Sequence, residues 1–260
     1  MPVKKQVPMT AAIPKTKAQE IIERLTNGTT RANWDQFSLA REKRALEECK
    51  KFDAANAYVG LGMIAVLEWN ESAVHSNFIN AIKLRDDEFT RDNYAISLQM
   101  MGRYRLAVEQ AKVVSDRYPT KLDSLRRLID CLHMLGDFPS AVHQLKIFEQ
   151  RSPGAPHAYA DVIRLIDKII TEVSFPIETV IASCETTYDL LLKKKVRIFS
   201  YSSLGDGEDK SVFHTLYIDR PADFVRELDM ELGDLLFDTV PGFSPGTFWI
   251  GVEKLRTSAV

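Results

Sequence analysis

Two stretches of the chain repeat one pattern at a fixed distance. The first reads Met101-Gly102-Arg103-Tyr104-Arg105-Leu106-Ala107, and the second reads Leu135-Gly136-Asp137-Phe138-Pro139-Ser140-Ala141. A glycine, an aromatic residue and an alanine recur in this order 34 residues apart, and Pro119 and Pro153 follow the two copies at the same offset. A fixed period of this length is typical of helical repeats, in which each unit covers the apolar face of its neighbour.

The two copies resemble the tetratricopeptide repeat, a pair of antiparallel helices of 34 residues. The resemblance is strongest over residues 88–155 and weaker over residues 54–87, where Ala73 lies 34 residues before Ala107. Each signature residue also has a physical role. The glycine ends the first helix at a tight turn, the alanine lets two helices approach closely, and the proline stops the second helix. The resemblance implies an α-solenoid whose concave groove holds a peptide or a partner helix.

The pattern divides the chain into three parts. Residues 1–17 contain three prolines and four lysines but no acidic residue, so we expect a mobile tail. Residues 18–195 form the helical-repeat domain, which a helical hairpin from Pro156 to Lys195 closes. Residues 196–260 change to strand-like alternation, with strands over 197–204, 211–219 and 247–255 and a helix from Pro221 to Asp238. We therefore predict a mainly α fold with a small ββαβ unit, packed on the solenoid because about 60 residues bury little surface alone.

Composition and charge indicate a globular protein. Of the 260 residues, 45% are hydrophobic and 27% are charged, and no stretch approaches the roughly 20 apolar residues of a membrane helix. No apolar run follows the basic N-terminus, so we expect a cytoplasmic protein. The net charge is −2, but residues 1–52 hold 11 basic and 6 acidic residues, whereas residues 196–260 hold 6 and 11. This asymmetry either steers a charged partner or is neutralised by contact between the two ends.

No motif indicates catalysis. The three cysteines lie far apart, and the glycine-rich signatures of phosphate and dinucleotide binding are absent. Arg127 and His133 match a loose nuclease pattern, but a six-residue step on a helix turns their side chains apart. The acidic residues of 206–209 fit no calcium loop and are typical of a polar turn. We expect a protein that is not an enzyme and binds no cofactor or metal.

A polar stripe on the repeat helices is the first candidate binding surface. Leu125, Leu128, Ile129 and Leu132 form the apolar face of one helix, which leaves a second stripe free for recognition. We predict that this stripe lies exposed on the concave surface. Because two of its residues are acidic, it would repel the carboxylate terminus that the family's best-known groove binds. The predicted residues are Asp92, Gln99, Arg126, Asp130 and His133.

These features favour a non-enzymatic interaction module, such as an adaptor, scaffold, assembly factor, chaperone or inhibitor. It would bind another protein through the groove, through the acidic C-terminal helix with Glu227, Glu231 and Asp234, or through both. A bacterial assembly factor or an inhibitor of a basic partner is one concrete version. The alternative is a nucleic-acid-associated regulator or nuclease-system component, which would use the basic N-terminal region and the cluster Lys193–Lys195. The cluster has a simpler explanation too, since cations stabilise a helix C-terminus.

Overall fold

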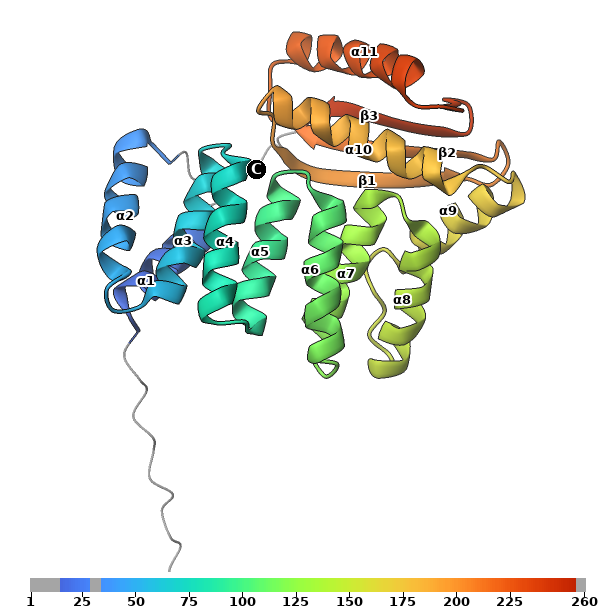
Figure 1. Ribbon diagram of the computed structural model, residues 1–260. Coiled ribbons are helices and arrows are strands. Elements are labelled where there is room, and N and C mark those ends of the chain that lie inside the picture. Colours follow the sequence, from blue (N-terminus) through green and yellow to red (C-terminus); the bar gives the residue numbers. More distant parts are fainter. Residues whose placement is uncertain (1–14, 29–33, 256–260) are drawn as a thin grey trace, which may run out of the picture.

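The computed structural model describes residues 15–28 and 34–255. These residues form a row of helices with a small sheet and two further helices lying along one side of the row (Figure 1). The helices of the row are α1 (Lys17–Gly28), α2 (Gln36–Cys49), α3 (Ala54–Leu67), α4 (Glu71–Leu84), α5 (Glu88–Met100), α6 (Tyr104–Arg117), α7 (Leu122–Leu135), α8 (Phe138–Arg151) and α9 (Ala160–Glu172). The remaining elements are α10 (Ile177–Lys193), β1 (Ile198–Asp206), β2 (Ser211–Ile218), α11 (Ala222–Thr239) and β3 (Phe248–Lys254).

The expected turns are confirmed at both glycines of the repeated pattern. Gly102 follows α5 with φ of 72°, and Gly136 follows α7 with φ of 81°, a left-handed conformation that glycine adopts at low cost. After the second turn, the Asp137 side chain accepts a hydrogen bond from the Ser140 N–H and caps α8. The helices α6 and α8 both end two residues before a proline. Local chemistry therefore explains where both hairpins begin, turn and end.

The two pattern alanines are fully buried, as the sequence predicts, with exposed fractions of 0% for both Ala107 and Ala141. A larger side chain at either position has no space without moving a helix. We expect Ala107→Leu and Ala141→Leu each to lower the free energy of unfolding by about 1–3 kcal/mol. Thermal and denaturant unfolding measure this loss, and the exposed Ala222→Leu on α11 is a control that should change little. Unchanged stability in both buried variants would contradict the assigned repeat register.

The C-terminal part has the predicted ββαβ order. β1 pairs antiparallel with β2 across the 206–211 turn, and β2 pairs parallel with β3. A parallel pair needs a long crossover connection, and α11 supplies it. The three strands lie in chain order, and β1 faces the helical row through its contact with α9. The prediction that strands occur in residues 196–260 is confirmed for the described residues, because the first strand begins at residue 198.

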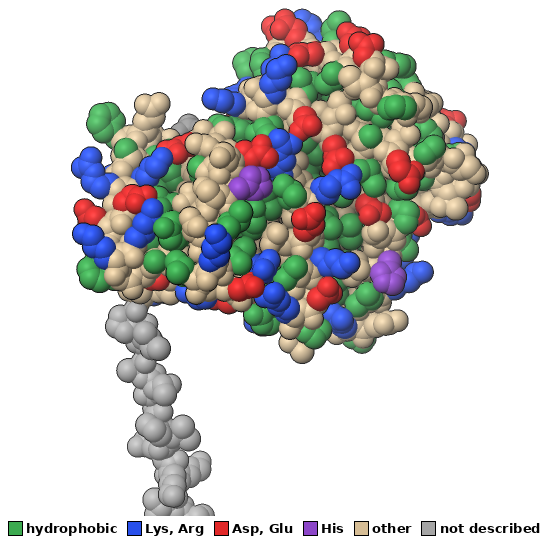
Figure 2. Space-filling model, in the orientation of Figure 1, with side chains coloured by type: hydrophobic (Ala, Val, Ile, Leu, Met, Phe, Trp, Pro, Cys, Tyr) green, Lys and Arg blue, Asp and Glu red, His purple; other side chains and the backbone are tan. Residues whose placement is uncertain are grey.

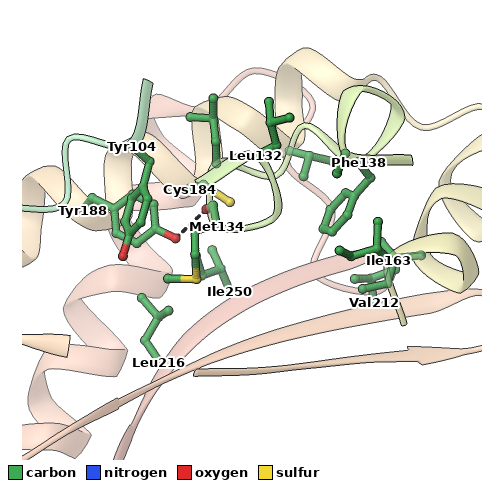
Figure 3. Close-up of a cluster of buried hydrophobic side chains, with 14 of the residues drawn as sticks. Tyr104, Leu132, Met134, Phe138, Ile163, Cys184, Tyr188, Val212, Leu216 and Ile250 are labelled. Atoms are coloured by element: carbon green, nitrogen blue, oxygen red, sulfur yellow. Dashed lines mark hydrogen bonds between the residues drawn. The ribbon is translucent and has the colours of Figure 1, made fainter. Parts of the chain in front are cut away.

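Helix α10 fastens this C-terminal part to the helical row. A β-carbon added to Gly102 would lie 3.1 Å from Tyr188 Cβ, and one added to Gly136 would lie 2.8 Å from Val180 Cγ1. Thus α10 runs across the turns of two successive hairpins. The Tyr188 hydroxyl donates a hydrogen bond of 2.6 Å to the Met134 carbonyl within an apolar cluster from both parts of the chain (Figure 3). The sheet therefore shares one core with α7 to α10.

Most of the predicted mobile tail, residues 1–14, lies outside the described residues, and the tail stays a prediction. Helix α1 begins at Lys17. The helix is anchored before its first turn, because Thr16 donates a hydrogen bond of 2.5 Å to the Asp53 carboxylate. Thr16 also accepts from the Gln19 N–H, as a capping residue does. The missed signal is the Thr16-x-x-Gln19 spacing, which is a capping box.

Candidate interaction site

The predicted polar stripe on α7 is only partly exposed. His133 is fully buried, so the expectation that it is exposed is wrong. Strand β1 covers it, and His133 Nε2 lies 2.8 Å from Ser203 Oγ. Its ring packs against Phe138, Tyr159 and Tyr201. The C-terminal unit of the chain thus occupies the end of the stripe where a partner was expected.

The other predicted residues of the stripe are engaged locally. Asp130 lies 3.3 Å from His157 Nε2, and Arg126 pairs with Asp123 at 2.7 Å. Asp92 is half-buried and lies 3.4 Å from Arg127. Burial raises the pKa of the Asp92 carboxyl, although Arg127 opposes that shift. The Asp92–Arg127 contact joins α5 to α7, and the Asp130–His157 contact joins α7 to the segment before α9. The Arg126–Asp123 pair lies within α7, and Arg126 is exposed.

Ser203 bridges two buried histidines. Its Oγ lies 2.8 Å from His133 Nε2 and 2.7 Å from His214 Nδ1, so the hydroxyl donates to one ring and accepts from the other. Burial lowers the pKa of His133 to about 3, with His214 adding to the shift, and burial lowers the pKa of His214 to about 4. Both rings are therefore neutral at physiological pH.

Among residues 15–28 and 34–255, the serine and histidines have no third group of a nucleophilic triad. In this part of the chain, His133 Nδ1 and His214 Nε2 are buried without a hydrogen-bond partner, so no described carboxylate orients either ring. Sequence spacing did not indicate this cluster, because its residues are 70 and 11 positions apart and come from α7, β1 and β2. The arrangement explains how β1 is held on α7, and it assigns no reaction.

Gln99 is the one predicted stripe residue that lines a sizeable cavity. This first cavity has a volume of about 470 Å³ and lies between the C-terminal end of α5, the end of α10 and the start of β1. Its walls are mostly apolar and include Ile96, Met100, Leu192 and Phe199. Phe199 is 47% exposed. The open part of the predicted groove is therefore at α5.

A second cavity of about 330 Å³ adjoins the first. It is lined by Trp34, Leu39, Leu67, Lys195, Asp219 and Arg220. The two cavities share Trp69, Val196, Arg197 and Phe199 as walls. We call the two cavities together the α5–β1 cleft. Its first half is apolar and its second half carries charged residues.

Arg197 stands where the two cavities meet. Its guanidinium lies over the Trp69 ring at 5.4 Å, and its Nε is buried with no hydrogen-bond partner. Within residues 15–28 and 34–255 no acidic side chain pairs with it. Burial lowers the pKa of Arg197, but arginine remains charged at neutral pH. The sequence offers no separate signal for Arg197, because it lies two residues after the lysine cluster.

The acidic helix and the lysine cluster meet in space. Lys194 pairs with Glu231 at 2.7 Å, which joins α10 to α11. Glu227 and Asp234 are exposed, as are Lys193 and Lys195. On the face in Figure 2, basic and acidic side chains are interspersed over the helical row. The acidic binding surface and the nucleic-acid alternative both stay predictions. One residue of the acidic surface, Glu231, and one residue of the lysine cluster, Lys194, already pair with each other.

Comparison with known proteins assigns no family: no family model matches this sequence, and no curated protein matches it either. Among the helices that the structure describes, none combines the length and apolar character needed to cross a membrane. In the same residues, no three histidine, cysteine or acidic side chains converge as metal ligands would.

Proposed function

We propose that the protein is a non-enzymatic interaction module of tetratricopeptide-like architecture that binds a partner segment in the α5–β1 cleft. The observation that carries the proposal is the pair of adjoining cavities beside Gln99, because concave apolar sites with a few polar groups are the usual binding sites of proteins. The 34-residue period supports the architecture. In this proposal the C-terminal unit forms one wall of the groove and narrows it to the length of a short segment.

Selection from a library of random peptides tests the proposal without knowledge of the natural partner. We expect peptides that bind the wild-type protein to lose at least about tenfold in affinity for Ile96→Glu, because the new carboxylate must lose its water in the apolar cavity. Ile79→Glu is the matched control, since Ile79 is 45% exposed on α4 and lines neither cavity. Equal affinity of the selected peptides for Ile96→Glu and wild type would show that the cleft is not the binding site.

A further inference from the structure

The charges of the α5–β1 cleft indicate the chemistry of its ligand. Arg197 has no acidic partner among the residues that the structure describes, although its Nε is buried and its guanidinium lies over the Trp69 ring. A buried cation without a counter-ion is unfavourable, so such residues are normally paired. A ligand that brings an anion to this position would supply the missing partner.

The second cavity adds cations around the same point. Lys195 and Arg220 line it together with one acidic residue, Asp219. Arg220 donates a hydrogen bond of 3.2 Å to the Lys195 carbonyl, which is a backbone oxygen and carries no full charge. Among the described residues, neither Lys195 nor Arg220 forms an ion pair. Counting Arg197, three cations face one carboxylate in this half of the cleft. The first cavity, in contrast, has apolar walls and offers space for aliphatic or aromatic groups.

The position of Arg197 argues for a segment that passes through the cleft. Arg197 lines both cavities, so a ligand that extends from one cavity into the other would pass this residue. A chain terminus would end at the arginine and leave one cavity empty. An extended segment would fill the apolar cavity with one part and the basic cavity with the next. The planar guanidinium, which lies over the Trp69 ring, can form two parallel hydrogen bonds to a carboxylate.

We propose that the α5–β1 cleft recognises a partner segment in which apolar residues are followed by acidic side chains, with one carboxylate paired to Arg197. The inference rests on the proposed function and specifies its partner. Apolar side chains occupy the cavity beside Ile96 and Met100, and the acidic residues extend toward Lys195 and Arg220. The polarity of the two halves sets the direction in which the segment lies.

Three short peptides test this assignment. The first is N-acetyl-Leu-Leu-Asp-Asp-amide, the second is the isosteric N-acetyl-Leu-Leu-Asn-Asn-amide, and the third is the Asn peptide with a free carboxyl terminus. Binding is followed by calorimetry and by the Trp69 indole NMR signal, which Trp69→Phe assigns. We expect the Asp peptide to bind at least about tenfold more tightly than the Asn amide, and this preference should shrink as salt is added.

Substitution of Arg197 tests whether this residue causes the preference for the Asp peptide. Arg197→Met keeps the apolar stem and should remove most of the tenfold preference, while Arg197→Lys, which keeps the charge but not the planar fork, should retain part of it. Arg44→Met is the matched control, since Arg44 is exposed on α2 and lines neither cavity. Thermal melts establish that each variant is folded. If Arg197→Met does not fold, the test relies on Arg197→Lys instead.

Several outcomes would overturn the inference. Equal binding of the Asp and Asn amides would do so, as would a preference that survives in Arg197→Met. Equally tight binding of the Asn peptide with a free carboxylate would assign the site to a chain terminus. Failure of all three peptides to bind would reject an apolar and acidic ligand. A different result would contradict the proposed function, namely library peptides that bind Ile96→Glu as tightly as wild type.

Discussion

Acidification from about pH 7 to about pH 5 is expected to destabilise the protein by roughly 2–4 kcal/mol through His133 and His214. In the unfolded chain both rings titrate near 6.5, whereas burial lowers their pKa values in the folded protein to about 3 and about 4. Below pH 6.5 the unfolded state therefore binds more protons than the folded state. The stability that the neutral rings provide is present above pH 6.5 and is lost as the pH falls toward 4.

Denaturant unfolding at a series of pH values measures this loss as the slope of the free energy of unfolding against pH. His214→Asn keeps a polar atom near Ser203 Oγ but cannot titrate, so the slope between about pH 6 and about pH 5 should fall by about half. His143→Gln is the control, because His143 is exposed on α8 and forms no part of the cluster. An unaltered slope in His214→Asn would mean that His214 is not a buried neutral ring on β2.

Gly136→Ala is expected to cost about 2–5 kcal/mol, the largest single-residue effect among these predictions. The residue has φ of 81°, which disfavours any side chain, and the new methyl group would lie 2.8 Å from Val180 Cγ1 and 3.1 Å from Cys184 Sγ. Because both contacts belong to α10, the substitution pushes the C-terminal unit away from the helical row. Denaturant unfolding gives the loss in free energy.

Gly154→Ala separates the cost of the left-handed backbone from the cost of the contacts with α10. Gly154 also has a left-handed backbone, with φ of 83°, but a β-carbon there meets no atom within 4 Å. Its substitution should cost only the conformational part, about 1–2 kcal/mol. Similar losses in the two variants would show that α10 does not pack against the turn at Gly136.

The helical hairpins could be predicted from the sequence because their signals are local. A glycine that ends a helix, an aspartate that caps the next helix and a proline that stops it each act within a few residues, as at Gly136, Asp137 and Pro153. The ββαβ order of the C-terminal unit follows from the same kind of evidence, a change in hydrophobic period after residue 195. Local patterns also predicted the burial of Ala107 and Ala141.

The binding stripe could be predicted only in part. The helical period correctly separated the apolar face of α7 from its polar face, but it contains no information on what covers the polar face. His133 was expected to face a partner, and it is instead covered by β1, 70 residues further along the chain. Gln99 belongs to the same stripe on α5, yet it lines a cavity whose other walls include the end of α10 and the start of β1.

The sequence by itself therefore determined the helices, their turns and the order of the C-terminal strands, since each depends on residues close together in the chain. Tertiary structure decided which polar residues are buried and which are accessible. Helix α10 crosses the turns at Gly102 and Gly136 and thereby sets β1 against α7, which buries His133 and leaves Arg197 at the junction of two cavities. Contacts of this kind join residues distant in sequence, so no periodicity within one helix can encode them.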